Sequence, residues 1–288
     1  MAPTDLPPHD YPAKSPPSAH PPSDRPLHDV CHALKDKIDA FLAEQPDDPR
    51  LRHVQDKLRE SMAIVEQALN QYEPDQFALS WNGGKDCLVM LVILLASIAR
   101  CYPRHDPSKA DEPNGTSTSS SLSSSTSFPE KLHAVYIVSA QPFAEVDEFV
   151  ESSSAEYHLD TARFTSSMKD GLGEFLKRDQ NIKAVFVGTR RTDPHGENLK
   201  PFHPTDPGWP PVMRLHPVLE WRLAEIWTFI RHLGIPYCPL YDQGYTSLGG
   251  RLDTLPNPRL KKEDGKVDGF RPAYELIEDD AERLGRYG

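Results

Sequence analysis

Residues 78–87, Ala-Leu-Ser-Trp-Asn-Gly-Gly-Lys-Asp-Cys, place polar side chains where a short apolar run meets a long one. The adjacent Gly83 and Gly84 permit a tight turn because neither carries a Cβ. The N–H groups of such a turn point into one concavity at the positive end of the following helix, which suits them to bind phosphate. The residues expected to form this phosphate-binding loop are Leu79, Ser80, Asn82, Gly83, Gly84 and Lys85.

Three polar side chains of this loop have distinct expected roles. The Asn82 amide can donate to a phosphate oxygen, Lys85 supplies a mobile positive charge, and Asp86 is either a Mg²⁺ ligand or a cap on the helix. The two commonest nucleotide fingerprints, Gly-x-Gly-x-x-Gly and Gly-x-x-x-x-Gly-Lys-Ser/Thr, are absent from the sequence. An ordinary strand–turn–helix corner is the plain alternative, and the Lys-Asp pair favours phosphate binding.

A second polar cluster begins at Gly188, directly after another apolar run. The Arg190 guanidinium can bind phosphate oxygens in a bidentate manner. Asp193 lies close to the end of the same run, where a carboxylate can bind Mg²⁺ together with Asp86. These residues predict a second contribution to the same phosphate and metal centre.

The polar residues that follow are interpreted more plainly. His195, Glu197 and Lys200 have the composition of a solvated surface loop. No cysteine or third histidine stands at a spacing that would complete a zinc site with His195 and His203, which argues against zinc.

Residues 206–214 form a proline-rich stretch around Trp209. Proline restricts the backbone and stiffens such a loop. Trp209 is then either part of the core or a platform for a flat heteroaromatic ring, with Arg214 close by, and the residues alone leave both interpretations open.

Taken together, these segments resemble one family. The loop at 79–87 is similar to that of the PP-loop superfamily, whose members cleave ATP between its α and β phosphates. The wider set of motifs resembles the fungal FAD synthetases, which are FMN adenylyltransferases. The segments that carry this resemblance are 79–87, 187–194, 208–217, 244–250, 255–258, 271–274 and 282–286.

The resemblance implies a reaction in which ATP and FMN, with Mg²⁺, give FAD and pyrophosphate. It implies catalytic roles for Asn82, Asp86, Asp193 and Arg283, with Asp86 and Asp193 at the metal. It adds Val138, Gly188, Arg190, Arg283 and Arg286 to the residues of the loop that bind ATP. The implied flavin site consists of Asp193, Asp206, Pro207, Gly208, Trp209 and Arg214. Without the resemblance, Arg283 and Arg286 would be interpreted as surface charges.

The elements needed to position these residues alternate along the chain. Apolar strands are expected at 76–80, 132–138, 161–165 and 182–187, and helices at 30–41, 49–69, 84–101, 143–157, 171–180 and 221–233. This alternation predicts an α/β fold, a Rossmann-like doubly wound and mostly parallel sheet. The resemblance implies the adenine nucleotide alpha hydrolase-like version, with extra N-terminal helices and a C-terminal extension. Ligands of such sheets bind at the carboxyl ends of the strands.

Composition bounds the organisation of the 288-residue chain. Residues 1–27 are rich in proline and are expected to be a disordered leader, and 28–288 to be the catalytic domain, with a flexible Ser-rich insert at about 106–130. The net charge of −11 argues against nucleic acid, and no apolar run is long enough for a membrane span. Four scattered cysteines are typical of a reduced intracellular compartment, so we expect a cytoplasmic protein. We also expect a monomer.

Two other functions are weighed against adenylyl transfer. A phosphoadenosine phosphosulfate reductase-like enzyme needs a reactive cysteine near the C-terminus, whereas the last cysteine, Cys238, lies between Tyr237 and Pro239. A non-catalytic nucleotide- or flavin-binding protein would not need the intact set of Lys85, Asp86 and Asp193.

Overall fold

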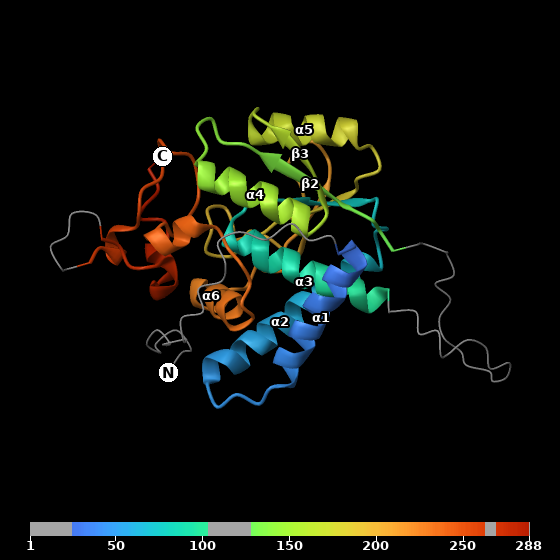
Figure 1. Cartoon of the computed structure of the whole chain (residues 1–288). Helices are drawn as coiled ribbons and strands as arrows, with labels where there is room; N and C mark the ends of the chain where they lie inside the picture. Colours follow the sequence, from blue (N-terminus) through green and yellow to red (C-terminus); the bar gives the residue numbers. More distant parts are fainter. Residues whose placement is uncertain (1–24, 103–127, 263–268, 288) are drawn as a thin grey trace.

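A six-stranded sheet in the order β3-β2-β1-β4-β6-β5 forms the centre of the computed structural model, which describes residues 25–102, 128–262 and 269–287 (Figure 1). All neighbouring strands run parallel except β5, which is antiparallel to β6 and lies at the edge. The strands are β1 (Phe77–Ser80), β2 (Leu132–Ile137), β3 (Leu159–Phe164), β4 (Ala184–Phe186), β5 (Phe202–Pro204) and β6 (Met213–Leu215). The prediction of a mostly parallel α/β sheet is confirmed.

Helix α3 (Lys85–Cys101) is apolar on all sides because it is enclosed on all sides. Every residue from 87 to 99 is buried. The sheet covers one side of α3, while α1 (Leu27–Ala43), α2 (Pro49–Leu69) and α6 (Leu223–His232) pack on the rest. This explains how an apolar run too short to span a membrane becomes the central helix.

Helix α2 begins as its sequence predicts. The Asp48 side chain accepts a hydrogen bond of 2.8 Å from the N–H of Arg50, and Pro49 occupies the first helical position. Both features fix the start of the helix, since the cap satisfies a free donor and proline lacks one.

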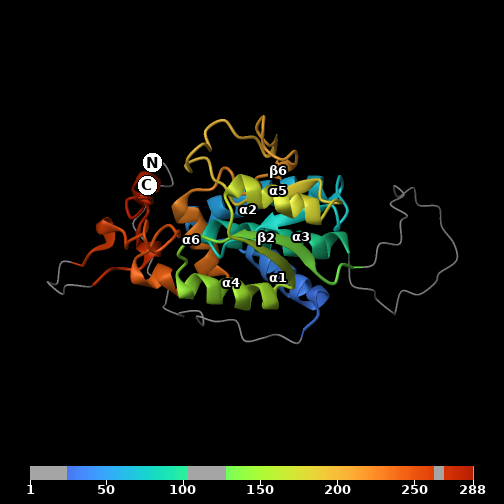
Figure 2. The ribbon, with the colours of Figure 1, turned by 90° about the horizontal axis from the view of Figure 1, so that it is seen from above.

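The two faces of the sheet are covered by different helices. Seen from above, α5 (Met168–Arg178) lies on one side, and α1 and α4 (Ala144–Glu156) lie on the other (Figure 2). Under α5 the core is small, made of Ala78, Val135, Ala162, Phe175, Ile182, Val185 and Val212. The much larger core on the other face joins α1, α2, α3, α4 and α6.

Several elements differ from the sequence-based expectation, and α1 begins three residues before its expected start at residue 30. Strands β5 (Phe-His-Pro) and β6 (Met-Arg-Leu) were not predicted, because each is short and, unlike the equally short β4 (Ala-Val-Phe), contains no apolar run. Helix α5 begins three residues before its expected start, where the hydroxyl of Ser167 accepts a hydrogen bond from Asp170 N–H. Glycines at 171 and 173 obscured that first turn.

After α6 the chain contains short 3₁₀ helices rather than longer elements: η3 (Pro239–Gln243), η4 (Pro258–Leu260), η5 (Ala273–Glu275) and η6 (Asp279–Ala281). Aromatic contacts attach this extension to α6. The ring of Trp227 lies 5.0 Å from that of Tyr241, and the guanidinium of Arg231 lies 3.7 Å from the centre of the Tyr274 ring. The extension thereby stays at one end of the molecule, shown in orange and red in Figure 1.

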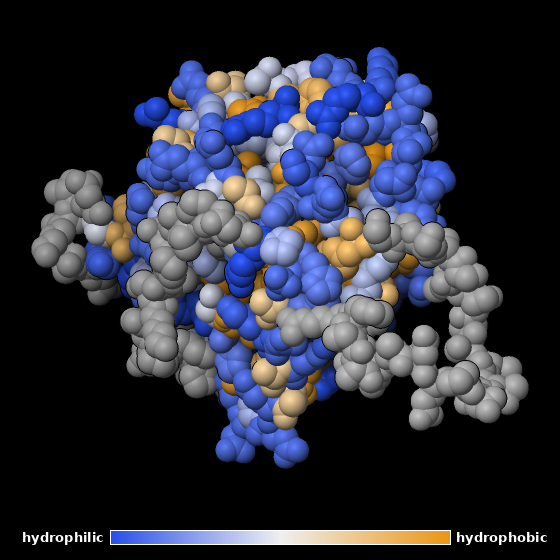
Figure 3. Space-filling view, turned by 45° about the vertical axis from the view of Figure 1, so that its right-hand side comes forward, coloured by the Kyte–Doolittle hydropathy of each residue, from blue (hydrophilic) through white to orange (hydrophobic). Residues whose placement is uncertain are grey.

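The predicted leader, apart from residues 25–27, lies outside the described residues, as does the predicted insert apart from residues 128–130. In the part of the chain that the structure describes, no helix combines the length and apolar character needed to cross a bilayer. The face shown in Figure 3 is mostly hydrophilic, with apolar residues in small separate patches.

Candidate active site

The glycine loop joins β1 to α3 at the carboxyl end of the sheet. Gly83 has φ of +72°, a conformation that favours glycine, so the turn expected from the sequence is present. The N–H of Gly84 donates to Oδ1 of Asn82 at 3.0 Å, and the N–H of Lys85 donates to the Tyr241 hydroxyl at 2.9 Å. Side-chain oxygens thus take two N–H groups that were expected to face a phosphate.

A cavity of about 270 Å³ opens beside this loop, and most of the predicted phosphate and metal residues line it. It is called the phosphate cavity below, after those predicted residues. From the glycine loop and the end of β4, the predicted residues are Ser80, Asn82, Gly84, Lys85, Asp86, Gly188 and Asp193. Arg283 and Arg286 complete the wall from the C-terminal extension. Segments that are nearly 200 positions apart in the sequence thus meet around one space, since Lys85 and Glu282 are separated by 197 positions.

Lys85 is not the mobile cation expected from the sequence. Its side chain is 2 % exposed, and its ammonium donates to Oδ2 of Asp86 at 2.9 Å and to Oε1 of Glu282. Burial acts to lower the pKa of Lys85, but the carboxylates of Asp86 and Glu282 outweigh it and raise the pKa. The ammonium therefore stays charged and fixed in place.

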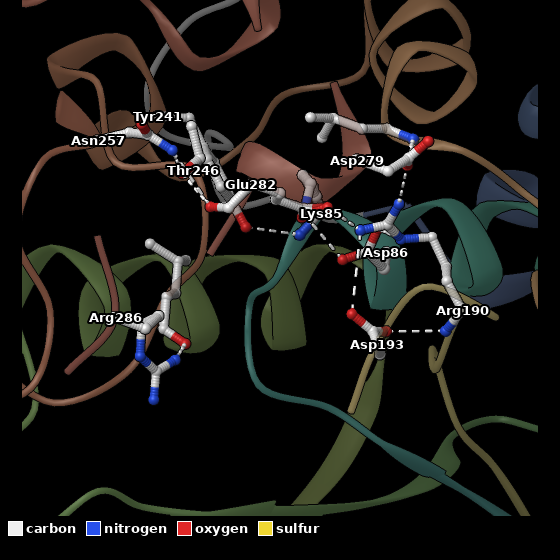
Figure 4. A network of polar contacts seen from close by, with 12 residues as sticks. Lys85, Asp86, Arg190, Asp193, Tyr241, Thr246, Asn257, Asp279, Glu282 and Arg286 are labelled. Atoms are coloured by element: carbon white, nitrogen blue, oxygen red, sulfur yellow. Dashed lines mark hydrogen bonds and ion pairs between the residues drawn. The ribbon is translucent and has the colours of Figure 1, made fainter. Parts of the chain in front are cut away.

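Arg190 was predicted to contact ATP, and its guanidinium is instead fully buried among carboxylates (Figure 4). Its Nε lies 2.8 Å from Oδ1 of Asp86, Nη1 lies 3.2 Å from Asp279, and Nη2 pairs with Glu282. Its backbone N–H donates to Oδ2 of Asp193 at 2.8 Å. Arg190 consequently organises the acidic side chains around the cavity.

The cluster around Arg190 carries excess negative charge. Two cations, Lys85 and Arg190, face the four carboxylates of Asp86, Asp193, Asp279 and Glu282, which leaves a formal charge of −2. Burial and the negative charge of Asp86 raise the pKa of Asp193. The pKa of Asp86 is lowered, because Arg190 and Lys85 together outweigh the effect of its burial. A bound divalent cation would offset this charge.

Asp86 and Asp193 are suitable ligands for such a cation. Both line the cavity, where Lys85 and Arg190 hold the two carboxylate oxygens of Asp86 in place. Within residues 25–102, 128–262 and 269–287, no group of three or more His, Cys, Asp or Glu side chains could hold a metal. The donor set fits Mg²⁺, which is typically held by one or two carboxylates together with substrate phosphates and water.

Trp209 lies at a second cavity, of about 830 Å³, between α5 and residues 208–211. The indole is 37 % exposed, so Trp209 is not a core residue, and its role as a platform for a flat ring stays a prediction. Gly208 lines this cavity as well and turns the chain with φ of +85°. Lys169 and Lys177 of α5 form part of the opposite wall.

The remaining predicted residues lie outside both cavities. Arg214 contacts the residues that precede Trp209: its Nη2 donates to the carbonyl of Pro204 at 3.0 Å and lies 3.4 Å from Oδ2 of Asp206. The other predicted residues that do not line the walls are Leu79, Gly83, Val138, Arg190 and Pro207.

Arg286 is fixed at the wall of the phosphate cavity. Its Nη1 donates to the carbonyl of Leu248 at 2.8 Å, and Nη2 lies 3.5 Å from Oδ1 of Asp253. Arg283 is exposed and lines the same cavity. The structure places both arginines at the wall of this cavity, and their binding of ATP stays a prediction.

Several residues of the site were missed. Tyr241, Glu282, Met168, Ser247 and Leu248 line the phosphate cavity without having been assigned a role. Tyr241 could not be found from its sequence neighbours, because its hydroxyl accepts a hydrogen bond from Lys85, 156 positions away. For Ser247, Leu248 and Glu282 the available signal was that segments 244–250 and 282–286 carry the family resemblance, and no sequence signal pointed to Met168.

Comparison with known proteins defines first the class of the chain. The phosphoadenosine phosphosulfate reductase domain family matches residues 76–256, which contain the glycine loop, strands β1–β6 and α6. With a parallel sheet and a glycine loop at the carboxyl end of β1, the chain is an α/β protein of the PP-loop class.

The particular family follows from closer relatives. The chain is 37 % identical over 237 residues to the "Probable FAD synthase" of Schizosaccharomyces pombe, which covers 82 % of this chain and 81 % of that protein. It is 36 % identical over 195 residues to the flavin adenine dinucleotide synthase of Saccharomyces cerevisiae, covering 65 % and 60 %. The chain belongs to the FAD synthase family.

Solved structures agree with this assignment. The Candida glabrata FMN adenylyltransferase in complex with FMN and the ATP analog AMPCPP superposes with a TM-score of 0.79 at 26 % identity, over 91 % of this chain and 100 % of that one. Yeast FAD synthetase in complex with FAD gives a TM-score of 0.78 at 27 % identity, over 91 % and 100 %. The chain spans 44 % of the "Probable FAD synthase" of Caenorhabditis elegans.

Proposed function

We propose that this chain transfers the adenylyl group of ATP to the phosphate of FMN, giving FAD and pyrophosphate. One observation carries the proposal: Asn82 of the glycine loop, Asp193 beyond β4 and Arg283 of the extension line a single cavity. That cavity combines donors for a polyphosphate with carboxylates for a metal. Membership of the FAD synthase family supports the same reaction.

The reaction needs alignment and charge neutralisation more than proton transfer. An oxygen of the FMN phosphate is already a nucleophile and attacks the α-phosphorus of ATP. The bond from the α-phosphorus to the oxygen that bridges to the β-phosphorus breaks, and pyrophosphate leaves with that electron pair. Arg283, Arg286 and the Asn82 amide would bind the phosphate oxygens and offset the repulsion between the two anions.

We propose Mg²⁺ as the metal, held by Asp86 and Asp193. When bound, it would supply the positive charge that the −2 cluster lacks. Asp86 stays ionised beside Lys85 and Arg190, and a cation bound at Asp193 would oppose the burial and the Asp86 charge that raise the pKa of Asp193. Both carboxylates would then be ionised.

The two cavities suggest how FMN would bind. They adjoin at the start of α5, because Met168 lines the phosphate cavity and the next residue, Lys169, lines the Trp209 cavity. The FMN phosphate would enter the first cavity and the flat flavin ring would lie against Trp209 in the second. Asp206, Pro207 and Arg214 would act by holding this loop. Adenine would bind near the end of β2, beside Val138.

The state of the cysteines disfavours the reductase alternative. Cys87 and Cys238 are buried, and burial raises the pKa of each thiol to about 12. A reductase of this class needs a reactive thiolate, which such surroundings suppress. Similarity to a reductase, that of Aliivibrio salmonicida, extends over 35 % of this chain.

The proposal is tested by incubating the protein with ATP, MgCl₂ and FMN and separating the products by chromatography. We expect FAD and pyrophosphate in equal amounts, and a folded sample that binds both substrates but forms neither product would establish a binding protein instead. Asn82→Ala and Asp193→Asn should each lower kcat by about a hundredfold or more. Asn198→Ala and Asp160→Asn, at exposed positions, serve as matched controls.

We further propose that the chain acts as a monomer in the cytoplasm, without nucleic acid or membrane partners. The net charge of −11 supports this, and so do four cysteines that are all free thiols. Size-exclusion chromatography with light scattering would give a mass near 32.4 kDa for the full chain. A mass twice as large would contradict the monomer.

A further inference from the structure

Glu282 connects three parts of the site that lie far apart in the sequence (Figure 4). Its Oε1 accepts a hydrogen bond from Lys85 at the start of α3, and its Oε2 accepts one from Arg190 beyond β4. Lys85, Arg190 and Glu282 are 2 %, 0 % and 4 % exposed. A carboxylate buried between two cations cannot move away without leaving both unpaired, which is strongly unfavourable.

The backbone of Glu282 is fixed as firmly as its side chain. The buried Asn257 amide donates to the carbonyl of Ala281 at 2.8 Å and to that of Glu282 at 3.3 Å. The Thr246 hydroxyl also donates to the Glu282 carbonyl and in turn accepts from Asn257 at 2.9 Å. The next residue, Arg283, therefore starts from a fixed point and extends into the cavity.

Asp279, in the same segment, makes a different connection. It pairs with Arg190 and accepts a hydrogen bond of 2.7 Å from the N–H of Leu223, at the first residue of α6. Asp279 thus joins the segment to α6, whereas Glu282 joins it to the lysine of the glycine loop. The contact between Glu282 and Lys85 therefore sets the distance between Arg283 and the loop that would hold ATP.

We propose that Glu282 is a positioning residue for adenylyl transfer: it bridges Lys85 and Arg190 and thereby places Arg283 against the phosphates in the cavity. This inference rests on the proposed function. It assigns Glu282 no contact with the reacting atoms, so its contribution passes through Arg283. Displacement of a charged donor by about 1 Å is enough to lower a rate by about a hundredfold.

The first test is Glu282→Gln, which keeps the size of the side chain and replaces one carboxylate oxygen by an NH₂ group that must face a cation. We expect kcat/KM for ATP to fall by at least about tenfold. The matched control is Glu275→Gln in the same extension, where the carboxylate pairs with Arg271 at 3.2 Å on the surface. That control should retain the wild-type value.

A double-mutant cycle distinguishes positioning from a structural role. If Glu282 acts through Arg283, the double variant with Glu282→Gln and Arg283→Ala has the same kcat/KM as Arg283→Ala alone. If Glu282 only stabilises the fold, the two losses multiply, and this result would overturn the proposal. Thermal unfolding of each variant identifies loss by unfolding. Should Glu282→Gln fail to fold, Glu282→Asp keeps the charge but is too short to bridge both cations and replaces it in the cycle.

Calorimetric titration of ATP into the wild type, Glu282→Gln, Arg283→Ala and the double variant separates this inference from the proposed reaction. A wild type that binds ATP but makes no FAD would contradict adenylyl transfer and leave Glu282 to be judged on affinity. The expected result is that Glu282→Gln and Arg283→Ala weaken ATP binding and that the double variant is no weaker than Arg283→Ala. Unchanged affinity in Glu282→Gln, with weaker binding in Arg283→Ala, would refute the positioning role.

Discussion

The guanidinium of Arg286 lies directly over the backbone of Gly249. A Cβ added to Gly249 would stand 2.5 Å from Nη2 of Arg286, closer than real Cβ contacts allow. The two residues lie in segments 244–250 and 282–286, which both carry the resemblance to the FAD synthetases described above. The close approach explains why a glycine is needed here: it leaves room for the arginine at the cavity wall.

Gly249→Ala should therefore impair the site without unfolding the protein. The methyl group would displace the end of a flexible side chain, at little cost in stability, but Arg286 would leave the phosphate cavity. We expect kcat to fall by about tenfold to a hundredfold, as in Arg286→Ala. Steady-state kinetics measures the change in kcat, and thermal unfolding measures the change in stability. Gly250→Ala is the control, because its Cβ would meet neighbours no nearer than 3.4 Å, and equal losses in the two variants would disprove the explanation.

Trp209→Ala should affect FMN and spare ATP. Removal of the ring platform would raise the KM for FMN by about tenfold, since stacking on an aromatic ring is worth about 1 kcal/mol. Trp209→Phe should recover part of the loss, and Leu252→Ala, another exposed apolar residue, should change neither KM. A rise in the KM for ATP as large as that for FMN would place Trp209 elsewhere in the reaction.

Gly188→Ala should destabilise the sheet. An added Cβ would lie 2.7 Å from the backbone nitrogen of Cys87 and 2.9 Å from its Cα, so β4 and α3 would have to separate. We expect the free energy of unfolding to fall by about 1–3 kcal/mol in urea denaturation. In contrast, Gly173→Ala within α5 meets its nearest atom at 3.4 Å and should stabilise by about 0.5–1 kcal/mol. The same sign in both variants would contradict the packing argument.

His216 should make stability depend on pH. Burial, followed by the charge of Arg214, lowers the pKa of His216 from 6.5 to about 4. The unfolded state then binds the proton more tightly, so stability is complete above pH 6.5 and decreases as the pH falls toward 4. The decrease at pH 4 should be about 3 kcal/mol.

Urea denaturation between pH 4 and pH 7 would measure this dependence. In His216→Gln the slope should be smaller by one proton. The control is His195→Asn, an exposed position with φ of 67°, which asparagine tolerates, and there the slope should remain. An unchanged slope in His216→Gln would assign the pH dependence to other groups.

Local patterns predicted the elements that depend on local causes. Asp48 and Pro49 mark the start of α2, and the glycine pair marks the turn before α3, because capping and positive φ act within a few residues. Strand β6 could not be found in this way. Its three residues are set by pairing with β4, a relationship that leaves no repeat in the sequence.

The residues of the site also fall into those that local sequence position predicts and those that it does not. Asn82, Asp86 and Asp193 follow strand ends, and topology alone brings such positions to one edge of the sheet. The roles of Arg190 and Lys85 could not be predicted, because both pair with Glu282 and Arg190 also pairs with Asp279. The positions of these two carboxylates depend on the fold of the whole extension. Only the shared motif at 282–286 pointed to that segment before the structure did.

The bridge between Lys85 and Glu282 also sets an order of events during synthesis. The two residues are 197 positions apart, so at usual elongation rates the ribosome needs roughly 10 to 40 seconds to travel from one to the other. All six strands lie before residue 216 and can pair in that interval, whereas Lys85 and Arg190 still lack the carboxylate of Glu282. The nascent protein thus acquires its sheet first and its nucleotide pocket last.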